Sequence, residues 1–208
     1  MSPTDMIPRL SAASLRIPNC HTLISAAGYM VGLMICCSAS GADLPAEKQA
    51  LFLARAITYD TNLKDRAGAG VNIGILAKKG NPDSEKMADT VTKAFLPLEA
   101  TTMLGLPVRL KRLAFVGREA LEKVVREAGI DTLYVCVSLD DDLADIVTVA
   151  RRNRVLTVAS QEAYIKLGLS LGVFSIQGKN SILVNLEASR QEGVAFGLEL
   201  LRIATVIK

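Results

Sequence analysis

The chain has 208 residues, half of them hydrophobic and none of them tryptophan, which is enough for one well-buried domain with an aliphatic core. Its 24 basic and 21 acidic residues leave a net charge of +3. This small charge, with aromatic residues at only 4%, argues against both the basic groove and the stacking platform of a nucleic-acid-binding protein.

The first 42 residues have the order of a secretory signal. Arg9 and Arg16 precede an uncharged stretch, Thr22–Ala42, which has an apolar centre and ends in the small residues S-A-S-G-A. We predict cleavage after Ala42, so that residues 1–42 are a signal peptide and residues 43–208 are the mature domain. Uncut, the stretch is about long enough to span a bilayer, and an N-terminal membrane anchor is the alternative. Both interpretations place the folded part outside the cytoplasm.

Cleavage would remove most of the residues that catalytic and metal sites use. The only histidine, His21, and three of the four cysteines lie in residues 1–42, which leaves Cys136 inside the apolar run L-Y-V-C-V-S. Without histidine there is no imidazole triad, zinc loses its usual ligands, and a cysteine nucleophile lacks its base. We therefore predict a binding protein rather than an enzyme, with no cofactor and no metal.

Helical and strand patterns alternate along the rest of the chain. An amphipathic helix is expected over residues 45–60, with Ala50, Leu51 and Ala54, together with Ile57 or Thr58, along one face. Apolar strands then alternate with helices of about ten residues. The expected strands are 71–77, 107–116, 132–137 and 155–159, and the expected helices are 84–95, 118–128, 141–152, 160–168 and, last, 195–207.

A G-K pair at residues 178–179 invites comparison with a phosphate-binding loop. Such a loop needs four residues before the pair, a Ser or Thr after it and then a helix. Here five residues separate Gly172 from the pair, Asn180 follows it, and the apolar run S-I-L-V comes next. The segment 172–186 therefore predicts a hairpin that turns at Gly178-Lys179-Asn180, with Gly and Asn supplying positive φ values. Together the patterns predict an α/β fold: a single three-layer Rossmann-like domain, mostly parallel, with a C-terminal antiparallel hairpin.

Two further clusters have both a structural and a functional interpretation. Gly68 and Gly70 precede the first strand and Gly74 lies within it, whereas the glycines of a dinucleotide fingerprint follow a strand; this favours a flexible entry to the first strand. The run 140–142, three aspartates after a strand, could hold Mg²⁺ or Ca²⁺. A receiver-type site would also need acids after the first strand, where lysines stand. We predict that the aspartates cap the following helix and bind no metal.

The C-terminal half resembles the YfiR family. The matching motifs are the L-T-V run at 156–158, the G-L-S-L-G run before the hairpin, the V-N-L-E-A-S-R-Q-E-G segment at 184–193 and the closing L-L-R-I-A. The resemblance covers about residues 48–208. It implies a small secreted α/β domain of the bacterial periplasm that restrains a membrane-bound diguanylate cyclase through its periplasmic part. The cysteines that form disulfides in some relatives are absent here: Ile130-Asp131 stand where one is often found, so disulfide control is not expected.

Two classes of function remain open. One is a regulatory module that binds the periplasmic domain of a membrane signalling protein. The other is a small-ligand receptor feeding a transporter or sensor, with its site at the strand ends near Ser138 and the 140–142 cluster. For the first class, the candidate partner interface is Leu51, Phe52 and Leu53, because three adjacent apolar residues cannot all face one core, and secondarily Tyr164 and Ile165. Burial of these residues, or packing in a homodimer, is the alternative.

Overall fold

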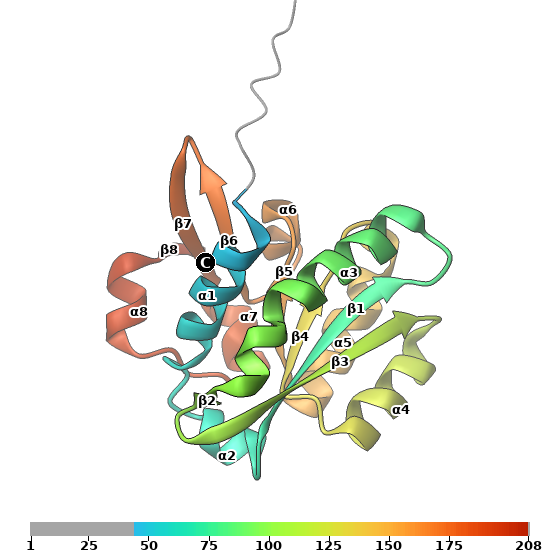
Figure 1. Ribbon diagram of the computed structural model, residues 1–208, viewed down its shortest axis with the longest axis horizontal. Helices are drawn as coiled ribbons and strands as arrows, with labels where there is room; N and C mark the ends of the chain where they lie inside the picture. Colours follow the sequence, from blue (N-terminus) through green and yellow to red (C-terminus); the bar gives the residue numbers. More distant parts are fainter. Residues whose placement is uncertain (1–43, 208) are drawn as a thin grey trace, which may run out of the picture. The chain divides into compact units, whose positions relative to one another are not determined.

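An eight-stranded sheet in the order β2-β3-β1-β4-β5-β6-β7-β8 runs through the middle of the fold (Figure 1). The computed structural model describes residues 44–207, so the predicted signal segment 1–42 lies outside the described residues. The neighbouring strands β3, β1, β4, β5 and β6 are parallel, which confirms the mostly parallel sheet. Their bounds are β1 Val71–Lys78, β3 Leu106–Phe115, β4 Thr132–Val135, β5 Leu156–Ala159 and β6 Leu171–Ile176; β2, Thr102–Met103, pairs antiparallel with β3.

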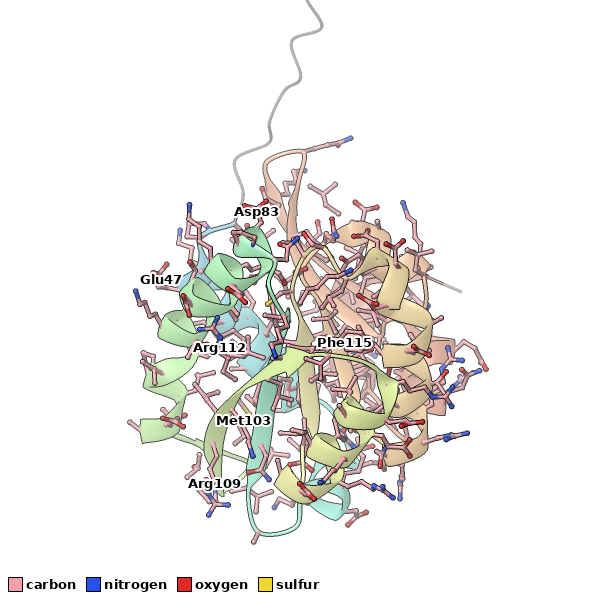
Figure 2. All side chains as sticks on the ribbon, turned by 90° about the vertical axis from the view of Figure 1, so that its right-hand side faces the viewer. Glu47, Asp83, Met103, Arg109, Arg112 and Phe115 are labelled. Carbon is pink, nitrogen blue, oxygen red and sulfur yellow. The ribbon has the colours of Figure 1, made fainter. Side chains whose placement is uncertain are left out.

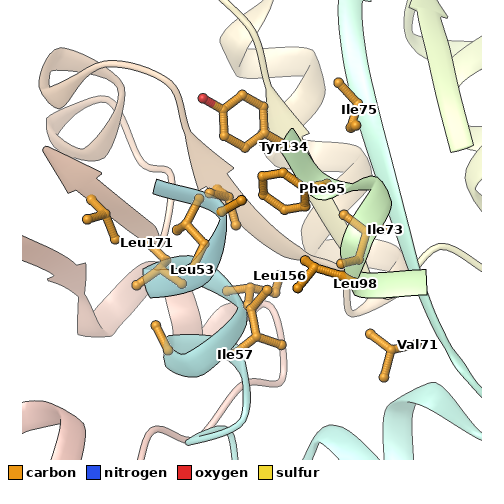
Figure 3. Close-up of a cluster of buried hydrophobic side chains, with 14 of the residues drawn as sticks. Leu53, Ile57, Val71, Ile73, Ile75, Phe95, Leu98, Tyr134, Leu156 and Leu171 are labelled. Carbon is orange, nitrogen blue, oxygen red and sulfur yellow. The ribbon is translucent and has the colours of Figure 1, made fainter. Parts of the chain in front are cut away.

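Helices cover both faces of this sheet, as the alternation predicted. The helices α1 (Ala46–Ile57) and α3 (Pro82–Phe95) contribute to one buried cluster, and α4 (Arg118–Ala128) and α5 (Leu143–Asn153) contribute to the other. Strand β1 supplies both clusters, because alternate side chains of a strand point to opposite faces. Figure 3 shows the first cluster, in which aliphatic side chains of α1 and β1 surround Phe95 and Tyr134.

The C-terminal hairpin is confirmed, with a correction to its turn. Strand β6 pairs antiparallel with β7, Lys179–Asn185, and the hairpin extends past the carboxyl ends of the parallel strands (Figure 1). The positive φ values lie at Gln177 (50°) and Gly178 (75°), and Asn180 belongs to the strand. A two-residue turn with both central residues at positive φ matches the twist of the two strands, so the turn is one residue earlier than predicted.

The end of the chain differs from the single helix expected over 195–207. It contains α7 (Leu186–Gln191), α8 (Leu198–Ile203) and β8 (Thr205–Ile207), and β8 pairs parallel with β7. The β-branched residues of the final T-V-I fit an edge strand better than a helix. The helix expected over 160–168 is the shorter α6, Glu162–Lys166, and the remaining short elements are α2 Leu63–Ala67, η1 Leu96–Ala100 and η2 Asp140–Asp142.

Gly74 lies inside β1, where the packing leaves no room for a side chain. A Cβ there would come within 2.9 Å of Leu113 Cδ1, 3.1 Å of Leu133 Cδ1 and 3.3 Å of Ile130 Cγ2. We expect Gly74→Val to lower the free energy of unfolding by about 1–3 kcal/mol, because it overpacks the cluster beneath α4. Urea unfolding measures this. The control is Lys111→Val, at the exposed position in register with Gly74; equal losses in the two variants would contradict the packing argument.

Candidate binding site

A cavity of about 660 Å³ lies at the carboxyl ends of the central strands, between α1 and α3. It is lined by the start of α1, the first turns of α3, strands β4 and β6, and the loops after β4 and β5. Open α/β sheets place their ligands outside the carboxyl ends of strands, near the point where the strand order reverses. That reversal lies here between β1 and β4. The cavity therefore occupies the position expected for a binding site.

Tyr134 forms the inner wall of the cavity. Its ring packs edge-on against Phe95, with ring centroids 6.0 Å apart, and its hydroxyl points away from the aliphatic cluster (Figure 3). The hydroxyl donates to Gln49 Oε1 at 3.1 Å, and Gln49 Nε2 donates to the Val173 carbonyl at 3.0 Å. Burial raises the pKa of Tyr134, so the hydroxyl stays protonated. This chain of hydrogen bonds links the start of α1 to β4 and β6.

Ser160, the first residue after β5, lines the cavity and has a hydroxyl with no partner. Its backbone N–H donates to the Val135 carbonyl at 3.2 Å, which fixes the residue at the strand end. The Oγ atom is buried and has no hydrogen-bond partner within residues 44–207. Most buried polar side-chain atoms are paired, so this hydroxyl is a donor and acceptor left for a ligand or a bound water.

Charged residues of α3 stand at the mouth of the cavity. Asp83 lies at the beginning of the helix (Figure 2), and Lys86 follows one turn later; both are exposed and both line the opening. Neither forms an ion pair within the described part of the chain. Their neighbour Asp89 pairs instead with Arg112 of β3, which Figure 2 shows beside α3. The mouth thus offers one free cation and one free anion.

The aspartates 140–142 follow β4 at the carboxyl-terminal edge of the sheet, but they do not cap the helix with their side chains. They form the 3₁₀ turn η2, in which the Asp142 N–H already donates to the Leu139 carbonyl, and no side-chain cap is present. Asp140 Oδ2 instead accepts from the Tyr164 hydroxyl at 3.1 Å. Asp142 Oδ2 lies 3.1 Å from Lys78 Nζ, in an ion pair without hydrogen-bond geometry. The capping prediction was wrong because backbone groups satisfy the turn.

No metal site is found in the part of the chain that the structure describes, because histidine, cysteine and acidic residues do not gather in threes there with suitable geometry. Ser138, the other rim residue named from the sequence, has a positive φ of 65° and does not line the cavity. Cys136 is buried and free, and burial raises the pKa of its thiol to about 12. A thiol of this kind is not a nucleophile at neutral pH.

The five candidate interface residues divide into exposed and buried positions. Leu51 is 65% exposed and Phe52 is 37% exposed on the outer face of α1, whereas Leu53 is fully buried. The apolar face predicted for α1 includes Leu51, whereas the buried face has Leu53 in its place. Tyr164 and Ile165 are also fully buried and do not belong to the surface. Only Leu51 and Phe52 remain available to a partner.

The cavity residues Gln49, Lys86, Tyr134 and Ser160 were not singled out from the sequence. Ser160 could have been found, since it directly follows a predicted strand at the edge where α/β sheets bind ligands. The other three carry no local signal. They reach the cavity only through the packing of α1 and α3 on the sheet.

A family model described as YfiR/HmsC-like matches residues 46–205. The chain belongs to this family. The resemblance noted in the motifs is thereby confirmed, and the family consists of periplasmic regulatory proteins without a catalytic activity of their own. In the YfiR/HmsC-like domain, no helix among the described residues has both the length and the apolar character to cross a membrane. No curated protein matches the chain.

Several solved structures share the fold of this YfiR/HmsC-like domain. An ABC domain in complex with L-Trp from Streptococcus pneumonia has a TM-score of 0.55 at 14% identity, and covers 78% of this chain. A conserved domain protein from Vibrio cholerae has a TM-score of 0.55 at 13% identity and covers 79% of this chain. The substrate-binding protein CD0873 from Clostridium difficile has a TM-score of 0.50 at 14% identity and covers 71% of this chain. The YfiR/HmsC-like chain spans 62%, 60% and 57% of those chains.

Proposed function

We propose that the protein is an exported regulator that holds a membrane-bound diguanylate cyclase inactive by binding its periplasmic part. The family match over residues 46–205 carries this proposal. The predicted signal segment supplies the route to the periplasm. Restraint follows if the regulator binds the inactive state of the cyclase more tightly than the active one, because equal affinity for both would shift no population.

The outer face of α1 is the proposed contact surface. Leu51 and Phe52 are exposed there, while Leu53 on the same turn anchors the helix in the core, so the two side chains can be changed without opening the cluster. Exposed aliphatic and aromatic side chains are the groups that a partner covers at the centre of an interface. A homodimer through the same face is the competing use of this surface.

We expect deletion of the gene to raise cellular cyclic di-GMP, and Leu51→Asp with Phe52→Asp to reproduce much of that rise. An added carboxylate must be desolvated on binding, which weakens the contact by several-fold or more. The measurement is cyclic di-GMP in cells complemented with each variant. Leu167→Asp, at an exposed leucine directly after α6, is the control and should restore the low level.

Two results would contradict this assignment. If the α1 variant restores the low nucleotide level as well as Leu167→Asp does, the contact lies elsewhere. If the wild-type protein sediments as a dimer that the α1 substitutions convert to a monomer, the face serves self-association.

One observation favours a second function, a small-ligand receptor. The cavity at the carboxyl ends of β4 and β5 has an unpartnered buried hydroxyl at Ser160 and free charges at its mouth. A receptor predicts that the deletion strain loses uptake or sensing of a solute while its cyclic di-GMP stays unchanged. The two measurements on the same strain separate the two functions.

A further inference from the structure

The cavity between α1 and α3 contains donors that the protein itself does not use. The Ser160 hydroxyl is buried without a partner, and the Lys86 ammonium at the mouth has no ion-pair partner within residues 44–207. Leaving a buried hydroxyl unpaired destabilises a fold, so such a group is a sign of a ligand or a bound water. A carboxylate accepts from both kinds of donor at once.

The charge at the mouth is more positive than its side chains alone suggest. Asp83 lies in the first turn of α3, where the positive end of that helix stabilises its charge. The 12-residue helix α1 also begins at this opening, with Leu44 and Ala46 in the lining; its first-turn acid, Glu47, is exposed and does not line the cavity. Lys86 lies beyond the first turn of α3, and no ion pair within residues 44–207 offsets its positive charge. An anionic head group is therefore favoured over a cationic one.

Much of the remaining lining is apolar, beside the polar residues Thr90, Gln161 and Ser175, and it sets the kind of ligand body that fits. Met87 and Val91 of α3 face the cavity from one side, and Val173 of β6 and Tyr134 close the other. A volume of about 660 Å³ falls in the range typical of small-molecule sites, roughly 300–1,000 Å³. An aromatic or branched aliphatic body packs against these apolar residues and displaces water from them.

We propose that this cavity binds a small monocarboxylate with an aromatic or branched aliphatic body, whose carboxylate is recognised by Lys86 and Ser160. The inference deepens the receptor function above and rests on it for its biological meaning. The site itself is a property of the isolated protein. It does not depend on whether a cyclase is the partner.

Three probes with one body and different heads test the proposal: phenylacetate, phenylacetamide and phenethylamine. Isothermal titration calorimetry on the purified protein should show saturable binding of phenylacetate, binding of phenylacetamide weaker by about fivefold or more, and the weakest binding for phenethylamine. Two results would overturn the proposal that the site selects a monocarboxylate. One is that phenethylamine binds as tightly as phenylacetate, and the other is that phenylalanine binds tighter than either because Asp83 recognises its ammonium group.

Two variants test whether Lys86 and Ser160 recognise the carboxylate. Lys86→Gln should weaken phenylacetate by about fivefold and leave phenylacetamide unchanged, while Lys93→Gln, exposed on the same helix, should change neither. Ser160→Ala should weaken both probes without lowering the melting temperature, since its hydroxyl makes no hydrogen bond in the protein. Equal effects of Lys86→Gln and Lys93→Gln would overturn the role of Lys86.

The outcomes also separate this proposal from the receptor function. No binding of any probe up to its solubility limit overturns the ligand class, and a solute-sensing defect in the deletion strain would then leave the receptor function standing. Binding of phenylacetate without any solute phenotype confirms the site and removes the receptor function.

Discussion

Replacing Asp60 by alanine is expected to lower the free energy of unfolding by about 3–5 kcal/mol, because it leaves a buried arginine without its counter-charge. The Asp60 and Arg66 side chains are 0% and 2% exposed, and Arg66 Nη2 lies 2.7 Å from Asp60 Oδ2. Asp60 Oδ1 also accepts from the backbone N–H groups of Asn62 and Ala195, each at 3.0 Å. The alanine variant therefore leaves the Arg66 charge and two backbone N–H donors without their partner.

The loss should spread beyond the pair, because Arg66 joins separate segments. Its Nη1 donates to the carbonyls of Asp131 at 2.9 Å and Arg154 at 2.8 Å, which precede β4 and β5. The pair thus ties the α1–α2 connection to the amino ends of two central strands. Urea unfolding followed by circular dichroism measures the loss.

Two variants serve as controls for Asp60→Ala. Asp65→Ala, an exposed acid on α2, should change stability by less than about 0.5 kcal/mol. Asp60→Asn keeps an acceptor for the two N–H groups and should cost less than the alanine variant. An Asp60→Ala protein as stable as Asp65→Ala would show that the buried pair contributes nothing.

The order of strands and helices was predictable from the sequence because each central element has its own local pattern. The buried strands are short apolar runs, the flanking helices are amphipathic, and G-K-N between two apolar runs identified the hairpin to within one residue. The closing T-V-I was assigned to a helix because the apolar pattern of 195–203 continues through it. Its strand conformation depends on pairing with the distant β7, which no local pattern reveals.

The buried face of α1 shows a different limit. The run L-F-L-A offers three adjacent apolar residues, and several helical faces through it are nearly equally apolar. Packing against α3 and β6 selects Leu53 and leaves Leu51 and Phe52 outside. The prediction that the three could not share one core was confirmed, but which of them is buried is decided by tertiary contacts.

For the candidate site, the sequence predicted the location better than the residues. The strand-end rule indicated the edge of the sheet where the cavity lies, and the aspartates at that edge form a turn and an ion pair. Gln49, Tyr134 and Ser160, which line the cavity, are 26 to 111 residues apart in the sequence, and Tyr134 donates a hydrogen bond to Gln49 across a separation of 85 residues. Such a site follows from how α1 lies on the sheet.

Glu192 is expected to make the protein less stable as the pH rises from about 4.5 to about 7. Its carboxylate is fully buried and accepts from the Thr157 N–H at 2.9 Å, the Thr157 hydroxyl at 2.6 Å and the Ser170 hydroxyl at 2.5 Å. Burial raises the pKa of Glu192 to about 7, although these hydrogen bonds and the charge of Arg151 oppose the shift.

The sign follows from proton binding. Between about pH 4.5 and pH 7 the folded protein keeps a proton on Glu192 that the unfolded chain has released, so the free energy of unfolding falls as the pH rises. The stability from this group is fully present below the unfolded pKa and is lost as the pH passes the folded pKa. Integrated over this window, the loss is about 3 kcal/mol. Asp131, whose pKa burial raises to about 6, acts in the same direction.

Glu192→Gln isolates this contribution because a neutral amide cannot ionise, while its oxygen can still accept from Thr157 and Ser170. Urea unfolding at intervals between pH 4.5 and pH 8 should show that the wild-type protein loses about 3 kcal/mol more than the variant over this range. Glu187→Gln, exposed on α7, should keep the wild-type slope. If Glu192→Gln and Glu187→Gln have the same pH dependence, Glu192 does not hold a proton in the folded protein, and its three hydrogen bonds are strong enough to keep the carboxylate ionised at neutral pH.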